Sequence, residues 1–423
     1  MQGFRIIPEG HVTLENVTVP GCVIGTADDL TVCNISIKDG QITDAPGAPI
    51  DMARAIALPC FTDMHTHVDK GHIWPRAANP DGTFMGALTT VADDRTANWS
   101  AVDVATRMEF SLRCAFAHGT KAIRTHIDSL VPQDQISWPV LAAKRAEWTG
   151  RINIQAASLI GCDSHESIKT GYAATADIVA EHGGCLGMVT YPVPDVKQRL
   201  LDFFELAGQR NLEVDFHADE TMDPESETLR LIAEMVLDLG WDRPVAVGHC
   251  CSLSTQDEAR ALDTLDLVAK AGLNIVSLPM CNLYLQDRQN GRTPRNRGLT
   301  LVHEMKARGI NVSFASDNTR DPFYAYGDMD MIEVLRQATR IGHLDHSDAN
   351  WFDTVTRNPQ KAMSLKQTAL APGEPADLIL CNARDWTELY ARPQADRIVL
   401  RNGVQIDTRL PNYADLDHLM EPA

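Results

Sequence analysis

Short runs of apolar residues recur along the middle of the chain and are separated by longer stretches with helical periodicity. Eight such runs lie at 58–67, 121–128, 152–161, 185–192, 212–219, 244–250, 273–282 and 310–318. Between them, ETLRLIAEMVLDLG and STQDEARALDTLDLVAKAG carry apolar residues at i, i+3 and i+4 and end in glycine, as amphipathic helices do. This alternation predicts an α/β fold with parallel strands, and eight repeats predict a (β/α)8 TIM barrel over residues 58–365.

The two ends of the chain follow a different pattern, in which apolar and polar residues alternate over short segments. HVTLENVTV and NISIKDGQIT near the start, and ADLILCN and RIVLRNGVQI near the end, are typical of strands. Asp39-Gly40 and Asn402-Gly403 are dipeptides that favour tight hairpin turns. We therefore expect one small β-sandwich-like domain built from residues 1–57 and 366–423.

An open, doubly wound sheet is the main alternative to a barrel. Such a sheet would predict a glycine-rich phosphate loop after the first strand, and no G-x-G-x-x-G or Walker motif occurs there. The first apolar run ends instead in His65-Thr66-His67, which favours the barrel.

Polar residues that can bind a metal or a proton follow four of the eight apolar runs. They are His65 and His67, His217 with Glu220, His249, and Asp317. Enzymes with this fold build their sites at the carboxyl ends of the barrel strands, so these side chains should meet. An isolated H-x-H pair is ordinarily two surface histidines, but here the i, i+2 spacing after an apolar strand places both rings on one face.

We predict that His65, His67, His217 and Asp317 bind one divalent metal ion. Imidazoles with one carboxylate suit Zn²⁺ or Fe²⁺, and four protein ligands with a water are typical of a catalytic rather than a structural site. Such an ion makes hydroxide available near neutral pH. The fourth run, CLGMVTYP, has no lysine that could bridge two metals, which argues against a binuclear site.

Glu220, His249 and Asp317 are the candidate catalytic residues. Glu220 follows His217 by three positions and would move a proton between water and a ring or leaving nitrogen, and a solvated loop acid is the alternative. His249 would stabilise the developing negative charge, or it is a buried histidine with ordinary partners. His126 also ends a strand, and we expect it to support the ligands from behind or simply to pack in the core. Lys70 either lines the pocket or forms a structural ion pair.

Composition narrows the class of partner. The chain has 423 residues, 44% of them hydrophobic and 22% charged, with a formal charge of 38 − 57 = −19. An acidic surface disfavours nucleic acid and anionic membranes as partners. The ten cysteines form no C-x-x-C pair, and neither a signal peptide nor a membrane span is recognisable. We expect a cytoplasmic homo-oligomer that acts on a small molecule.

The motifs HTHVDK, DFHADE, GHC and ASDN, with the closing GEPADLIL and VLRNGV, resemble the amidohydrolase superfamily. The resemblance covers nearly the whole chain and is to the cytosine-deaminase-like branch, which includes N-isopropylammelide aminohydrolase. It implies that His65, His67, His217 and Asp317 hold zinc or iron(II), that Glu220 shuttles a proton and that His249 positions the hydroxide. The implied reaction replaces an exocyclic amine with oxygen and releases ammonia.

The same resemblance bears on the substrate, because cytosine deaminases pair a glutamine at the end of the third strand with the amide edge of the pyrimidine. Here that region reads Ser-Leu-Ile-Gly at 158–161, and Asn318 follows Asp317 where those enzymes usually have a second aspartate. We expect the substrate to contact Leu159, Ile160, Asn318, Asp321 and Phe323. We expect the substrate to be cytosine or a related amino-substituted N-heterocycle. The alternatives are hydrolysis of an ammelide-type triazine or a cyclic amide, and a barrel that binds a ligand without catalysis.

Overall fold

The computed structural model describes residues 3–347 and 350–420. Its strands are β1 (Val12–Pro20), β2 (Leu30–Lys38), β3 (Gln41–Thr43), β4 (Ala48–Asp51), β5 (Ile56–Pro59), β6 (Phe61–Thr66), β7 (Thr120–Asp128), β8 (Asn153–Leu159), β9 (Leu186–Thr190), β10 (Val214–Ala218), β11 (Val245–His249), β12 (Asn274–Ser277), β13 (Asn311–Phe314), β14 (Leu378–Cys381), β15 (Ile398–Arg401) and β16 (Val404–Gln405).

Helices occupy most of the segments between the central strands. They are α1 (Gly21–Ile24), α2 (Phe84–Asn98), α3 (Ala101–His118), α4 (Asp134–Glu147), α5 (Ile168–Gly171), α6 (Ala173–Glu181), α7 (Val196–Gln209), α8 (Thr228–Leu239), α9 (Glu258–Ala271), α10 (Pro279–Leu285), α11 (Val302–Ala307), α12 (Met331–Gly342), α13 (Arg357–Ala362), α14 (Trp386–Ala391) and α15 (Asp417–Met420). Short 3-10 turns follow β11 and α12 and precede α13 and α15.

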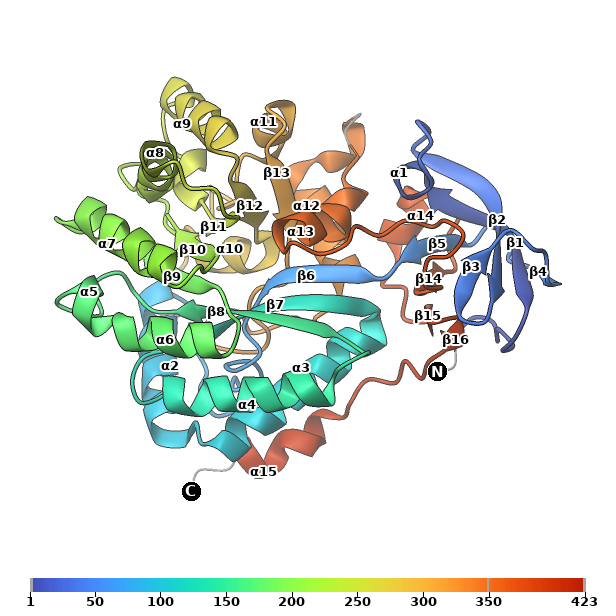
Figure 1. Ribbon diagram of the computed structural model, residues 1–423, viewed down its shortest axis with the longest axis horizontal. Coiled ribbons are helices and arrows are strands. Elements are labelled where there is room, and N and C mark those ends of the chain that lie inside the picture. The colour runs from blue at the N-terminus through green and yellow to red at the C-terminus, as the bar shows by residue number, and fades with distance from the viewer. Residues whose placement is uncertain (1–2, 348–349, 421–423) are drawn as a thin grey trace.

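Strands from both ends of the chain share one sheet. Its order is β16-β15-β14-β5-β1-β2-β3, and β4 pairs with β1. Figure 1 shows the blue amino-terminal strands beside the orange and red carboxyl-terminal ones. Asp39-Gly40 and Asn402-Gly403 all have positive φ, as two-residue hairpin turns require, and they join β2 to β3 and β15 to β16. Both hairpins are confirmed, whereas the bounds and sandwich-like form of a separate small domain stay predictions.

Eight parallel strands form the centre of the molecule. They make a five-stranded sheet, β13-β12-β11-β10-β9, and a three-stranded sheet, β6-β7-β8. Isolated parallel bridges join β8 to the β9 segment at Ala157–Cys185, and Thr66 of β6 to Asp317 beyond β13. The parallel α/β class is confirmed. Closure into one barrel stays a prediction, which these bridges at both sheet edges support.

Helices cover the outside of the parallel strands. In Figure 1, α3, α4 and α6 lie along β6–β8, and α7, α8 and α9 lie beyond β9–β11. Helices α8 and α9 match the two amphipathic segments of the sequence, and each ends at a left-handed glycine, Gly240 or Gly272. Glycine adopts this conformation without a steric penalty and satisfies the last helix carbonyls. The buried residues of both helices, among them Ile232 and Leu265, belong to the same hydrophobic core as the strand residues Phe216 and Val247.

Two of the eight predicted strands differ from the structure. The run 58–67 spans two strands, because β5 pairs with β14 in the terminal sheet and the central strand β6 begins only at Phe61. The run 273–282 is wrong beyond Ser277, where β12 ends. Pro279 begins helix α10, since proline has no N–H to donate and its fixed φ suits the first helical turn.

Two further observations concern the whole chain. All ten cysteines lie in the described part of the structure and are free thiols. Within residues 3–347 and 350–420, no helix has both the length and the apolar character needed to cross a membrane.

Candidate active site

Five predicted residues meet at one end of the parallel strands. His65 and His67 come from the end of β6, His217 from β10, His249 from the last position of β11, and Asp317 from the segment after β13. All five side chains are buried. The backbone N–H of Asp317 donates to the carbonyl of His65 at 2.9 Å, which fixes the eighth segment against the first.

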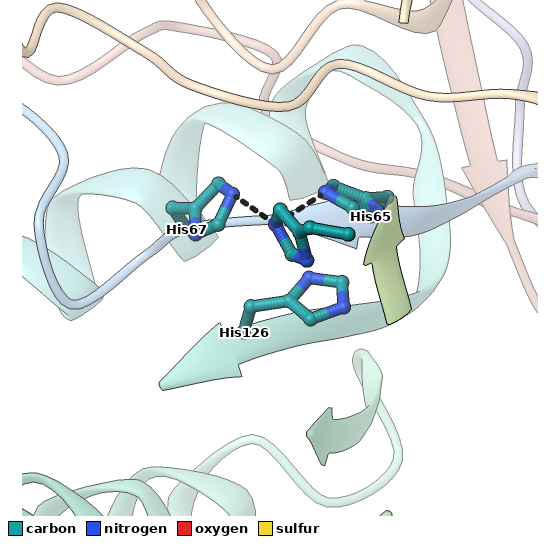
Figure 2. A group of neighbouring side chains, drawn as sticks. His65, His67 and His126 are labelled. Carbon is teal, nitrogen blue, oxygen red and sulfur yellow. Dashed lines mark hydrogen bonds between the residues drawn. The ribbon is translucent and has the colours of Figure 1, made fainter. Parts of the chain in front are cut away.

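The four predicted metal ligands lie within reach of one ion. The Nε2 atom of His217 is 3.1 Å from that of His65 and 3.5 Å from that of His67, as the dashed lines in Figure 2 mark. Asp317 Oδ1 is 3.1 Å from His67 Nε2 and 3.7 Å from His65 Nε2. Two ligand atoms of a tetrahedral zinc ion lie about 3.3 Å apart, so these separations fit a single metal.

Unpaired buried atoms give an independent test of that fit. Among the described residues, neither carboxylate oxygen of Asp317 has a hydrogen-bond partner, and buried acceptors without partners are rare in proteins. Burial lowers the pKa values of His65, His67 and His217 well below 6.5, so these rings are neutral and keep a lone pair for a cation. The residues present therefore suit a divalent ion of the zinc or iron(II) kind.

His126 belongs to the same cluster, which the sequence did not indicate. Its ring centroid is 4.0 Å from that of His65, and it forms a four-histidine group with His65, His67 and His217 (Figure 2). Its Nε2 lies 3.0 Å from Asp215 Oδ1, so the carboxylate accepts from that nitrogen. This carboxylate fixes which way the ring faces. The supporting or packing role expected for His126 stays a prediction.

Glu220 and His249 lie side by side, and Asn282 joins them. His249 Nδ1 is 3.4 Å from Glu220 Oε1, and Asn282 Nδ2 is 3.0 Å from that nitrogen and 3.4 Å from the same oxygen. An amide nitrogen only donates, so His249 Nδ1 accepts and its Nε2 carries the proton. Because Nε2 has no hydrogen-bond partner among the described residues, its N–H is available to donate to a ligand beside the cluster.

The two carboxyl groups of the site have raised pKa values. Burial, and then the nearby charge of Asp317, raise the pKa of Glu220 well above 4.5. Burial raises the pKa of Asp317 to about 7. Glu220 can therefore carry a proton at neutral pH, which a general acid must do.

The strand ends carry backbone strain. His249 has φ 71° and Asp317 has φ 63°, and both lie in the left-handed region that non-glycine residues rarely adopt. Such residues cost about 1–3 kcal/mol each and persist only where the surroundings hold them. Here the strain turns both side chains into the cluster.

Asp219, next to Glu220, has a structural role. Its carboxylate accepts from the backbone N–H of Thr228 and of Leu229, each at 2.9 Å. It thereby satisfies the first free N–H groups of α8 and anchors the loop that carries Glu220.

A cavity of about 400 Å³ opens beside the cluster. Four of the five predicted substrate contacts line it, namely Leu159, Ile160, Asn318 and Phe323. Asp321 is buried outside the lining and accepts from the Asn318 amide at 2.7 Å, so it orients a wall residue. The cavity also exposes His67, His217, Glu220, His249 and Asp317.

Several cavity residues were not predicted from the sequence. Phe84, Leu88, Val91 and Ala92 of α2 form an apolar wall, and Tyr191 lies after β9. Asn282 was also missed, because it was placed at the end of a strand. A proline three positions earlier, which starts α10, is the signal that could have located it.

Comparisons with known proteins agree with this geometry. The family described as "Amidohydrolase family" matches residues 164–406. Pterin deaminase of Rhizobium rhizogenes is 50% identical over 416 residues, which cover 96% of this chain and 95% of that protein. N-isopropylammelide isopropyl amidohydrolase of a Pseudomonas species is 22% identical over 90% of this chain and 92% of its own.

The fold has a similar counterpart among solved structures. The crystal structure of 5-methylcytosine deaminase from Klebsiella pneumoniae with 5-fluorocytosine superposes with a TM-score of 0.80 and 25% identity, over 95% of this chain and 98% of that one. The metal-competent strand ends and these relatives define a hydrolytic enzyme. The chain belongs to the amidohydrolase family, in its cytosine-deaminase-like branch, and is a hydrolytic deaminase.

Proposed function

We propose that this enzyme deaminates a pterin, replacing the 2-amino group of a 2-amino-4-oxopteridine with oxygen and releasing ammonia. The observation that carries the proposal is the 50% identity to a pterin deaminase along 96% of the chain. Cytosine, the substrate expected first, belongs to the same chemical class of amino-substituted N-heterocycles. The comparisons support that class rather than cytosine itself.

The cavity supports a flat, two-ring substrate. Its volume of about 400 Å³ lies in the range of small-molecule sites, and Phe84, Leu88 and Phe323 give it apolar walls. Phe84 and Phe323 pack edge to face with centroids 5.5 Å apart, so they form a firm surface for a heteroaromatic ring. The polar groups of the cluster lie at one part of this lining, where the amine-bearing carbon would sit.

The proposed chemistry assigns roles to the chain's own residues. His65, His67, His217 and Asp317 would hold the metal, and a divalent ion bound there lowers the pKa of water towards about 7. Glu220 moves one proton of the attacking water to the ring nitrogen, and it moves the second, from the hydroxyl group then on the carbon, to the departing amine. His249 Nε2–H donates to the oxygen that gains charge. One water is consumed, the C–N bond breaks, and ammonia leaves.

A smaller ring is the second candidate, favoured by the likeness to the 5-methylcytosine deaminase structure. The test compares ammonia release by the metal-loaded protein from pterin, cytosine, 5-methylcytosine, isocytosine, ammelide and creatinine. We expect kcat/KM for pterin to exceed that for each single-ring amine by about 100-fold, because a second ring buries more apolar surface. A preference for cytosine would overturn the pterin assignment, and ammonia from none of these amines would overturn the deaminase.

Glu220→Gln tests the proton shuttle. The amide keeps the size of the side chain but cannot carry the proton, so kcat should fall about 1,000-fold while metal content is unchanged. Glu225→Gln on the same loop is the matched control, since Glu225 is exposed and pairs with Arg260 outside the cavity. Equal turnover by Glu220→Gln and the native enzyme would refute the role of this residue.

A further inference from the structure

Lys70 and Asp128 form a charged pair in the cavity wall that the chemistry above does not use. Lys70 follows the end of β6, and Asp128 is the last residue of the adjacent strand β7. Both line the cavity that holds Glu220, yet Lys70 is only 4% exposed and Asp128 only 7%. Charges so deeply buried are normally engaged by close partners, because their desolvation is costly.

The two charges do not satisfy each other. Lys70 Nζ is 3.9 Å from Asp128 Oδ2, beyond hydrogen-bond distance, whereas a well-formed ammonium–carboxylate pair closes to about 2.8 Å. Among the described residues, Asp128 Oδ2 has no hydrogen-bond partner. One buried acceptor and one buried donor therefore stand next to each other with capacity for a third group.

Neighbouring residues hold the pair apart. Arg95 Nη1 donates to Asp128 Oδ1 at 3.2 Å, and the backbone N–H of Asp128 donates to Asp69 Oδ2 at 2.8 Å. Lys70 Nζ lies 5.2 Å from the centre of the Phe323 ring, a cation–π contact. The carboxylate is thus fixed through one oxygen while the other faces the ammonium and the cavity.

We propose that this pair recognises the lactam edge of the substrate ring, the carbonyl and the adjacent N–H. Lys70 donates to the carbonyl oxygen, and Asp128 Oδ2 accepts from the ring N–H. The inference rests on the proposed function and names the part of the substrate that this site recognises. In an amide the oxygen and nitrogen lie about 2.2 Å apart, and hydrogen bonds fanning outward from them reach partners spaced like Lys70 and Asp128.

The end of β8 offers no polar side chain that could recognise the lactam edge. Leu159 and Ile160 present apolar side chains to the cavity, and Gly161 presents none. No amide side chain from β8 is therefore available there for a lactam edge. Lys70 after β6 and Asp128 at the end of β7 supply a donor and an acceptor to the cavity instead.

Methylated pterins test the proposal in the native, metal-loaded enzyme. A methyl group on N3 removes the lactam N–H, whereas a methyl group at C6 leaves the lactam edge intact. We expect kcat/KM for 3-methylpterin to fall about 100-fold below that for pterin, and 6-methylpterin to stay within about threefold, because a buried carboxylate left unpaired is costly. Equal rates for pterin and 3-methylpterin would overturn the inference while leaving the proposed function in place.

Variants separate recognition from structural support. In Asp128→Ala, the ratio of kcat/KM for pterin over 3-methylpterin should drop from about 100 to below about 5, since neither substrate then has the acceptor. Lys70→Met should lower kcat/KM for pterin about 30-fold with metal content unchanged, and Lys70→Arg should restore part of it. Lys144→Met, which removes a lysine paired with Glu109 and Glu147 outside the cavity, should change neither value.

The outcomes distinguish the two proposals. Equal losses on pterin and 3-methylpterin in Asp128→Ala, with the ratio retained, would show a structural role and overturn the inference. If Asp128→Ala does not fold, Asp128→Asn keeps the volume of the side chain and the native comparison of methylated pterins still decides. No ammonia from any pterin with the native enzyme would overturn the proposed function, and the inference would fall with it.

Discussion

Two parts of the cavity differ in how they are built. The floor, formed by the candidate metal ligands His65, His67, His217 and Asp317, comes from the ends of parallel strands and the residues just beyond them, and it is buried throughout. The outer wall, formed by Phe84, Leu88, Val91 and Ala92, comes from helix α2, and Leu88 is 46% exposed. A backbone hydrogen bond from Asp317 to the His65 carbonyl fixes two of the floor residues against each other, whereas the wall lies on one helix. We therefore expect changes in the floor to act on turnover and changes in the wall to act on substrate affinity.

His217→Ala should have the largest effect, because it removes a central ligand of the floor. We expect loss of bound metal and a fall in kcat/KM of about 1,000-fold or more, since a metal supplies several kcal/mol of transition-state stabilisation. Metal analysis and ammonia release measure both. His11→Ala is the control, because His11 directly precedes β1, its ring nitrogen bonds the Ala45 carbonyl, and it is not part of the cavity lining. Full metal content in His217→Ala would show that the floor is assigned wrongly.

Metal affinity should depend on pH through Asp317. Burial raises its pKa to about 7, so protons compete with the ion and affinity falls about tenfold per unit as pH drops below 7. The histidines add little competition between pH 5 and 7, because their pKa values lie well below 6.5. Chelator competition from pH 5 to 8 measures this slope. A flat profile in the native protein would contradict it, and Asp317→Asn should bind more weakly with a flatter profile.

Phe84→Ala should have the smallest effect and should act on the wall alone. Loss of ring contact with the substrate should raise KM about tenfold while kcat and metal content stay within about twofold. Met85→Ala on the same helix is the control, since Met85 is 62% exposed and is not part of the cavity lining. A large fall in kcat for Phe84→Ala would mean that floor and wall are not separable.

The same contrast explains what could be predicted from the sequence. The i, i+2 spacing of His65 and His67 and the position of His217 follow from strand periodicity, which brings the ends of parallel strands together. Asn282 was missed because an apolar run hid the turn at Pro279, after which the chain is helical. Phe84 lies on α2, where the apolar Met85 is exposed and the charged Asp94 is buried, so the apolar pattern of the sequence did not identify the face that lines the cavity.

The proximity of Lys70 and Asp128 could not be predicted from any pattern in the sequence. The two residues are separated by α2 and α3 in the chain, and only the pairing of β6 with β7 brings them together. From the sequence, a place for Lys70 in the pocket lining and a structural ion pair were equally supported. In the structure Lys70 lines the cavity and faces Asp128, at a distance of 3.9 Å that is too long for a hydrogen bond.

The left-handed backbone at His249 and Asp317 matters for any attempt to engineer a more thermostable form of this enzyme. Glycine adopts such φ values freely, so a search guided by melting temperature alone would favour it at both positions and would relieve the strain. The product would lack both of these site side chains. Tolerance to heat and turnover are opposed at these two positions, and directed evolution should hold both fixed while it varies the helix above them.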